Sequence, residues 1–172
     1  MKIIIEGPNN VGKTTLIKNI LKMKKFKDFE IEHLSGRTPN TKEFHEDLLK
    51  LPQNMIFDRF FIGELIYPEI FNRKSNITEK QVIDLCKKYK NDILIIFIDA
   101  DYEFIIRSNK NKNEQFNYEE VKKEKEGFYK YKNIFNKIKG LKIISFKNSK
   151  ENEIEYKEFL NQIDLLGENY EI

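Results

Sequence analysis

Short apolar runs alternate along the chain with amphipathic segments. The runs are rich in Ile, Leu and Phe, and they lie at residues 2–6, 29–34, 54–58, 93–99 and 142–146. Runs of this length and composition, bounded by Gly, Asn and Asp, predict β-strands. Regular alternation of strands with helices predicts an α/β fold, with a mainly parallel five-stranded sheet and helices on both faces.

Apolar residues between these runs recur at three- and four-residue spacing, which predicts helices. The predicted helices begin at Lys13, cover Phe44 to Leu49, run from Ile62 to Ile70, start near Thr78, start near Tyr102, pass through Phe128 and Phe135, and close the chain. The run at 93–99 is continuously apolar, as in a strand covered on both faces, so we expect it to be central. Ligands of open α/β sheets bind at the carboxyl ends of the strands.

Length and composition indicate how many domains the chain forms. The length of 172 residues fits one domain, and 40% hydrophobic residues with 14 Phe and 8 Tyr suffice for one sizeable core. No repeat and no Pro/Gly/Ser-rich linker interrupts the chain, so we expect a single domain over residues 1–172.

Charge and cysteine content bear on the partners and the cellular compartment of the protein. The 31 basic and 28 acidic residues leave a net charge of +3, which by itself does not imply a nucleic-acid partner. A single Cys cannot form an intramolecular disulfide, no apolar run approaches the ~20 residues of a membrane helix, and the N-terminus is unlike a signal peptide. We therefore expect a soluble cytoplasmic protein without membrane contact.

A phosphate-binding pattern lies between the first predicted strand and helix. Gly-x-x-x-x-Gly-Lys-Thr is met by residues 7–14, called the P-loop below. Glycines let backbone N–H groups approach phosphates, the lysine reaches the β- and γ-phosphates, and the threonine hydroxyl ligates Mg²⁺. The pattern predicts an ATP and Mg²⁺ site made of Gly7, Pro8, Asn9, Asn10, Val11, Gly12, Lys13, Thr14 and Thr15. The alternative is a glycine-rich turn without nucleotide.

Two charges end the third predicted strand. Asp58 can hold Mg²⁺ or accept a proton from an acceptor oxygen, and Arg59 can clamp a phosphate with two hydrogen bonds. Both would lie beside the P-loop in a doubly wound sheet. Together with the P-loop they favour catalysis of phosphoryl transfer over the alternative of a surface ion pair.

These segments resemble thymidylate kinase and its relatives among nucleotide and deoxynucleoside kinases. The likeness rests on the P-loop with its flanks, on Asp58-Arg59, and on a tyrosine, Tyr67, nine residues after the Asp. It implies a P-loop kinase fold, a catalytic role for Lys13, and contact of Tyr67 with the acceptor sugar. The family usually has Asp and Gly where this chain has Asn9 and Asn10.

A polar segment, residues 107–118, fits the family's mobile lid. Lids of this kind exclude water and bring cations to the transferring phosphate. The resemblance places Arg107 on the ATP side as a catalytic residue, whereas Lys110 and Lys112 could equally be solvated. Arg37, after the second predicted strand, could approach an acceptor phosphate or pair with a surface carboxylate.

We therefore expect ATP-dependent phosphoryl transfer to a nucleotide, first of all a deoxynucleoside monophosphate such as dTMP. One alternative is a kinase of a nucleoside or modified-base hydroxyl, with DNA as a partner in that case alone. A second alternative is a P-loop ATPase or nucleotide-binding switch without an acceptor, although the chain lacks a guanine-specifying Asn-Lys-x-Asp motif. Members of the family are often dimers, so the resemblance allows a homodimer.

Overall fold

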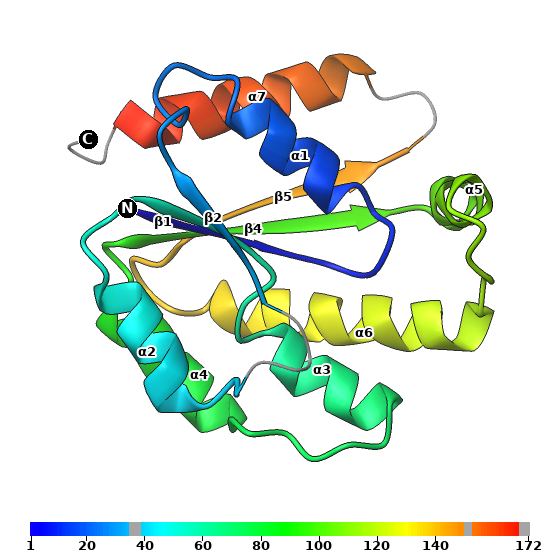
Figure 1. Cartoon of the computed structure of the whole chain (residues 1–172), viewed down its shortest axis with the longest axis horizontal. Coiled ribbons are helices and arrows are strands. Elements are labelled where there is room, and N and C mark those ends of the chain that lie inside the picture. The colour runs from blue at the N-terminus through cyan, green and yellow to red at the C-terminus, as the bar shows by residue number, and fades with distance from the viewer. Residues whose placement is uncertain (35–38, 150–152, 169–172) are drawn as a thin grey trace.

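The computed structural model describes residues 1–34, 39–149 and 153–168. It contains one parallel sheet in the order β2-β3-β1-β4-β5, as Figure 1 shows. The strands are β1 (Lys2–Glu6), β2 (Glu30–His33), β3 (Met55–Asp58), β4 (Ile93–Ala100) and β5 (Lys142–Asn148). The expected α/β fold with a five-stranded parallel sheet is confirmed.

Seven helices are described, and most begin where the sequence places a capping residue. They are α1 (Lys13–Ile20), α2 (Lys42–Lys50), α3 (Gly63–Ile70), α4 (Glu79–Lys88), α5 (Tyr102–Asn111), α6 (Tyr118–Phe135) and α7 (Glu153–Glu168). Thr78 forms a capping box with Gln81 at the start of α4, and Asp101 accepts the Phe104 N–H at the start of α5. Such caps satisfy N–H groups that the first helical turn leaves unpaired.

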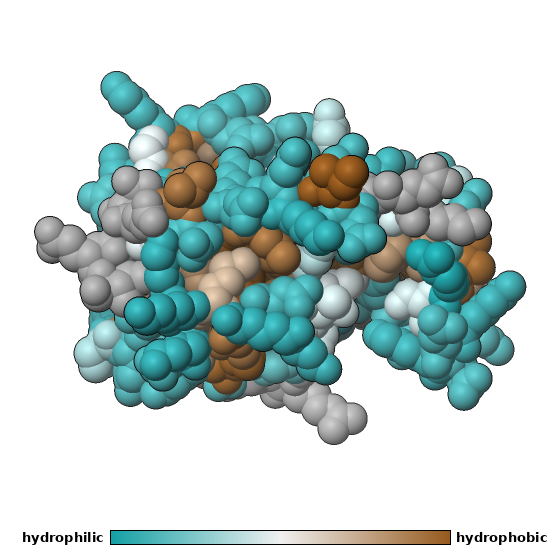
Figure 2. All heavy atoms as spheres, turned by 90° about the horizontal axis from the view of Figure 1, so that it is seen from above, coloured by the Kyte–Doolittle hydropathy of each residue, from teal (hydrophilic) through white to brown (hydrophobic). Residues whose placement is uncertain are grey.

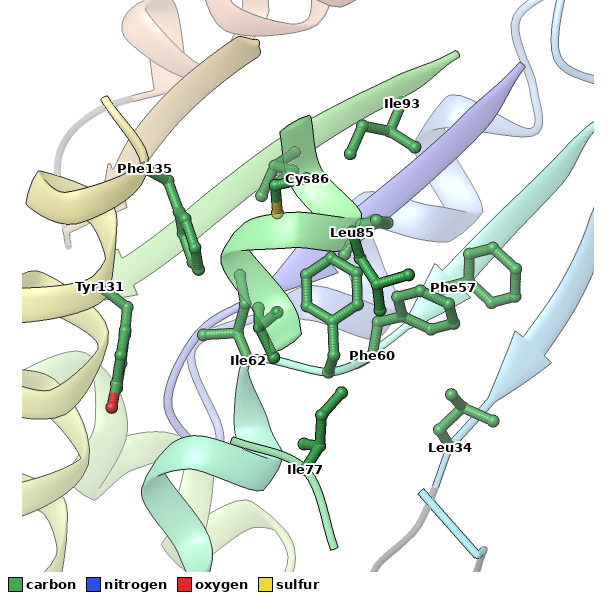
Figure 3. Close-up of a cluster of buried hydrophobic side chains, with 14 of the residues drawn as sticks. Leu34, Phe57, Phe60, Ile62, Ile77, Leu85, Cys86, Ile93, Tyr131 and Phe135 are labelled. Atoms are coloured by element: carbon green, nitrogen blue, oxygen red, sulfur yellow. The ribbon is translucent and has the colours of Figure 1, made fainter. Parts of the chain in front are cut away.

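The interior strands β1, β3 and β4 bury both faces because their apolar side chains alternate between two cores. Ile4, Phe57 and Ile95 belong to the core beneath the sheet in Figure 1, which α2, α3, α4 and α6 cover. Figure 3 shows this core, in which Phe60 lies beside Phe57 and residues of α4 and α6 complete the packing. A continuous apolar run is therefore needed in each interior strand.

The opposite core lies between the sheet and the helices α1 and α7. It contains Ile3, Ile5 and Ile96 from the strands, Leu16 from α1 and Ile163 from α7. Seen from this side, the surface is mostly hydrophilic, with apolar patches that are small and scattered (Figure 2). Within the described ranges, none of the helices combines the length and apolar character that crossing a bilayer would require.

The chain adds β2 and β3 on one side of β1 and then β4 and β5 on the other side, and this strand order creates the site. β1 pairs with β3 on one side and β4 on the other, with Ile5 opposite Asp58. The loop that leaves β1 therefore opens at the carboxyl end of the sheet, directly beside the end of β3. Crevices of this kind are where open α/β sheets bind ligands.

The expectation of a central strand at residues 93–99 is confirmed, because β4 is buried along nearly its whole length and pairs with β1 on one side and β5 on the other. One expectation needs correction. The segment at 107–118 is not a continuous loop: α5 extends to Asn111 and α6 begins at Tyr118, so residues 112–117 connect two helices. The polar side chains of the last turn of α5 lie on a helix that is only partly buried, so polarity did not exclude helix here.

Candidate functional site

The P-loop packs tightly against the sheet. A Cβ at Gly7 would lie 1.9 Å from the Ile98 carbonyl oxygen of β4, so only glycine allows this approach. Gly12 adopts a left-handed conformation, with φ of 98°, immediately before α1. The loop therefore delivers its backbone N–H groups to the start of α1, where the helix dipole favours anions.

Lys13 lies within this loop, with 6% of the residue exposed. Its Nζ donates to the Gly7 carbonyl at 2.8 Å and also to the Pro8 carbonyl. Burial, and then the charge of Arg59, lower the pKa of Lys13 to about 7, while nearby carboxylates oppose this shift. A phosphate would supply the negative charge that favours the protonated amine.

Thr14 and Thr15 are exposed in the first turn of α1, at the same end of the sheet as the Asp58 carboxylate. Asp58 ends β3 and is 9% exposed. Its Oδ2 lies 3.1 Å from His33 Nδ1, at the end of β2, whereas its buried Oδ1 has no hydrogen-bond partner among the described residues. Hydroxyl and carboxylate oxygens are ligands that Mg²⁺ prefers, so Thr14 and Asp58 fit the expected metal.

Arg59 is held in a left-handed conformation, with φ of 69°, which is uncommon for a side chain of this size. Its backbone N–H donates to the Ile5 carbonyl at 3.0 Å. Its guanidinium donates to Asn9 Oδ1 and lies 5.5 Å from the centre of the Tyr67 ring. The strand end thus aims a cation at the space between the P-loop and α3.

A pocket of about 240 Å³ opens beside this guanidinium. Its lining includes Asn9, Arg59 and Tyr67, and it continues along α3 to Glu64 and Arg73. Tyr67 is buried, burial raises its pKa above the ordinary value, and its hydroxyl has no hydrogen-bond partner in the described part of the chain. Of the residues that the sequence assigns to an acceptor, the structure therefore brings Arg59 and Tyr67 together.

The segment predicted to be a lid, residues 107–118 (the lid segment below), contacts the P-loop through the Asn10 side chain. Asn10 Nδ2 donates to Asn109 Oδ1 at 2.5 Å and to Glu114 Oε2 at 2.7 Å, and Asn10 Oδ1 accepts from Lys112 Nζ at 2.5 Å. Lys112 therefore does reach the loop, whereas Lys110 is an exposed residue of α5.

The structure places Arg107 beside Phe104 on α5. It is exposed on α5, and its guanidinium lies 5.6 Å from the centre of the Phe104 ring. That ring comes within 3.8 Å of the position that a Cβ on Gly12 would occupy. The Phe104 ring thus lies near both the Arg107 guanidinium and Gly12 of the P-loop. Arg37 lies outside the described residues.

Glu6 is a site residue that the sequence analysis did not assign. It is fully buried at the end of β1, and its Oε1 accepts the backbone N–H groups of Phe60 at 2.9 Å and Ile62 at 3.1 Å. Burial raises the pKa of Glu6 to about 7, against the effect of these hydrogen bonds and of nearby cations. A polar residue ending an apolar strand was the available signal.

Three more residues were missed because they are distant in sequence. Glu124 of α6 is buried and accepts from the Asn9 backbone N–H at 2.6 Å and from Asn9 Nδ2 at 2.7 Å. Asn148, the last residue of β5, donates to the Val11 carbonyl at 2.6 Å. His33 was given no role, yet its register opposite Asp58 makes the contact described above.

The comparisons with known proteins define a class of fold. No family model matches the chain. The sheet, its helices and the P-loop are those of the P-loop kinase fold, which solved structures of similar architecture share. This likeness does not single out thymidylate kinases.

Three solved structures illustrate this similarity. The crystal structure of YorR from Bacillus subtilis in complex with phosphorylated GDP matches with a TM-score of 0.79 and 20% identity, over 100% of both chains. Deoxyadenosine kinase from M. mycoides with bound dATP gives 0.59 and 17%, covering 95% of this chain and 100% of that one. A gluconokinase from Sinorhizobium meliloti 1021 gives 0.61 and 10%, covering 98% and 94%.

In sequence, the chain is 30% identical over 105 residues to the SPbeta prophage-derived protein YorR of Bacillus subtilis (strain 168). The match covers 58% of this chain and spans 61% of the length of that relative.

Proposed function

We propose that the chain is an ATP-dependent kinase that transfers the γ-phosphoryl group to a deoxynucleoside monophosphate, with dTMP as the first acceptor to test. The observation that carries this proposal is the placement of Arg59 between two sites. On one side lies the P-loop with the buried Lys13, and on the other lies the pocket that contains Tyr67.

On the donor side, the P-loop amides and Lys13 would hold the β- and γ-phosphates of ATP. Lys13 now donates to two carbonyls of its own loop, and a phosphate would replace them as the better partner for its charge. Lid residues at the tip of the loop would exclude water, so that the phosphoryl group passes to the acceptor and not to solvent.

Mg²⁺, held by Thr14 and Asp58, would neutralise charge on the phosphates and orient them. The residues of the chain would contribute by binding and orienting the two reactants. Arg59 would bind the acceptor phosphate and stabilise the charge that builds up during transfer, and Asn9 fixes the guanidinium in place. Little covalent chemistry is needed from the protein.

On the acceptor side, the relatives support a nucleotide. YorR was crystallised with phosphorylated GDP, and deoxyadenosine kinase was solved with dATP and with the products dCMP and dCDP. A second candidate is phosphorylation of a nucleoside hydroxyl. It is favoured by the unpartnered Oδ1 of Asp58 within the described residues, since that oxygen could accept the hydroxyl proton.

The test is a screen of deoxynucleosides and their monophosphates with ATP and Mg²⁺, measured by product formation. We expect transfer to monophosphates, and Lys13→Ala should lower kcat by about 10²- to 10³-fold, because it removes a cation from the transferring phosphate. Lys18→Ala is the control, since Lys18 is exposed on the same helix. Transfer to nucleosides alone would favour the second candidate, and full activity of Lys13→Ala would exclude both.

A further inference from the structure

A cavity of about 370 Å³ lies between α6 and the carboxyl ends of β4 and β5. It is larger than the acceptor pocket beside Arg59, and among the described residues the two have no lining residue in common. Pro8 of the P-loop forms part of its wall. Sites for small molecules usually have volumes of roughly 300–1,000 Å³, so this cavity has the size of a ligand site that the proposed transfer does not use.

Regular helix and strand spacing builds the walls of this cavity. Lys125, Phe128 and Lys132 follow one another on α6 at spacings of three and four residues, so they share one face of the helix. Ser145 and Lys147 are two positions apart on β5, so they share one face of the strand. Since α6 runs beneath the sheet (Figure 1), the helix and the strand each contribute a wall.

The next residue of β5 contacts the P-loop. Asn148 donates to the Val11 carbonyl at 2.6 Å, and successive residues of a strand face opposite sides. Lys147 of the cavity and Asn148 beside the P-loop therefore lie on different faces of β5. We accordingly expect the cavity to take a ligand while ATP occupies the P-loop.

Positive charge is in excess in the lining of the cavity, which contains three lysines and one carboxylate. Lys125 donates to Asp99 Oδ1 and to the Ala100 carbonyl, so its charge is compensated within the protein. Lys132 forms no ion pair within the described ranges, and its Nζ lies 5.7 Å from the centre of the Tyr129 ring. An anion in the cavity would supply the partner that Lys132 lacks.

Aromatic side chains give the same cavity an apolar surface. Phe97 and Phe128 are buried, whereas Tyr129 is 65% exposed beside them. Aromatic rings pack favourably against other planar groups. An inorganic anion would leave these rings uncovered, and a neutral ring would leave Lys132 without a partner, so neither matches the whole lining.

We infer that this cavity is a second ligand site, which binds a small aromatic anion: one planar ring that carries a phosphate, sulfonate or carboxylate group. The ring would pack against Tyr129 and Phe128, and the anionic group would meet Lys132. The volume suits one ring with one acidic group.

The site can be tested with a fluorescent reporter, because the chain contains no Trp. Tyr129→Trp keeps an aromatic ring and places a single Trp beside the cavity. This full-length variant is titrated with phenyl phosphate, benzoate, benzyl alcohol and inorganic phosphate, with a non-hydrolysable ATP analogue in excess.

We expect phenyl phosphate to bind at least about fivefold more tightly than inorganic phosphate, which lacks the ring, or benzyl alcohol, which lacks the charge. Benzoate should exceed benzyl alcohol for the same reason. Benzyl alcohol binding as tightly as the two aromatic anions, or inorganic phosphate binding as tightly as phenyl phosphate, would overturn the inference.

A charge variant links binding to the cavity. Added to the reporter, Lys132→Gln should weaken phenyl phosphate binding about 3- to 10-fold, because it removes the cation that meets the anionic group. Lys122→Gln is the control, since Lys122 is exposed on the same helix outside the cavity lining. Equal weakening in the two variants would contradict a specific role for Lys132.

A second variant fills the space itself. Ser145 is exposed on the edge strand β5, where an aromatic residue suits the strand, so Ser145→Phe should fold and lower the affinity for phenyl phosphate at least about tenfold. Ser145→Ala leaves the space open and should bind like the reporter alone. Unchanged affinity in a folded Ser145→Phe variant would place the ligand elsewhere and overturn the inference. If that variant does not fold, the comparison of Lys132→Gln with Lys122→Gln still decides.

Discussion

Single residues in this site are held in conformations that their neighbours impose. Arg59 adopts a left-handed backbone, which costs a residue with a Cβ roughly 1–2 kcal/mol. The turn that follows is fixed by Glu6, whose carboxylate accepts the N–H groups of Phe60 and Ile62. Glu6 thus supports the residue that we propose to bind the acceptor phosphate, although it does not itself reach the pocket.

The buried position of Glu6 should make stability depend on pH. Because its pKa rises from 4.5 to about 7 on folding, the folded protein binds this proton more tightly than the unfolded chain does. The free energy of unfolding therefore falls, through this group, as pH increases from about 4.5 to 7. Glu6→Gln removes that titration. We expect the variant to gain up to about 3 kcal/mol relative to wild type between pH 4.5 and 7.5, measured by chemical denaturation.

Glu158→Gln serves as the control, because Glu158 is exposed on α7. A stability difference between Glu6→Gln and wild type that is the same at both pH values would contradict the role given to Glu6.

Contacts between elements couple the P-loop to the lid. Asn10 has a left-handed φ of 60°, a conformation that asparagine tolerates better than most residues. Its side chain meets Asn109, Lys112 and Glu114. Asn9, which bonds Glu124 of α6, and Asn10 therefore hold α6 and the lid segment against the loop.

Asn10→Gly should release the lid without disturbing the loop, since glycine also suits this backbone. We expect amide hydrogen exchange at residues 112–117 to become about 5- to 10-fold faster, as the loss of hydrogen bonds worth roughly 1 kcal/mol implies. ATP hydrolysis in the absence of acceptor should increase as water enters. Asn113→Gly is matched, because Asn113 is exposed in the same segment with a φ of 55°. Equal exchange in both variants would show that Asn10 does not hold the lid.

At the scale of the whole molecule, the site depends on the order of the strands. β1 lies between β3 and β4, so the P-loop has Asp58 on one side and the backbone of β4 beneath it. The contact of Gly7 with the Ile98 carbonyl joins the loop to the interior of the sheet.

Gly7→Ala should therefore damage both stability and nucleotide binding. A Cβ 1.9 Å from a backbone oxygen cannot be accommodated unless the loop or β4 moves, and we expect a loss of at least about 3 kcal/mol in the free energy of unfolding. Gly140→Ala is the comparison: Gly140 also has a positive φ, of 86°, but its Cβ would meet only the Lys90 side chain at 3.6 Å. It should lose about 1–2 kcal/mol and keep ATP binding. Similar losses in the two variants would contradict the argument from the close approach.

The sequence predicted the strands and helices well because their signals are local. An apolar run bounded by turn residues, or a cap before an amphipathic segment as at Thr78, depends on neighbours within one or two turns. The prediction was less accurate for the last turn of α5, where polar side chains on an exposed helix look the same as a loop.

Site residues, too, could be predicted only where their signal is local. Those that belong to a local pattern, Lys13, Asp58, Arg59 and Tyr67, could be named from the sequence, and the structure brings them together. Glu124 reaches Asn9 across 115 positions, and no local spacing indicates such a contact. Arg73 and Glu64 are close in sequence, but their meaning comes from the pocket that they line.

The sequence by itself determined the parallel α/β architecture and the phosphate-binding loop, because both follow from short-range periodicity and from glycine geometry. Only the tertiary structure decided what surrounds that loop. The strand order puts Asp58 beside it, α6 supplies Glu124, the lid reaches Asn10, and α3 closes the pocket that ends in the Glu64–Arg73 pair. Long-range contacts depend on how elements pack, and packing is a property of the whole chain.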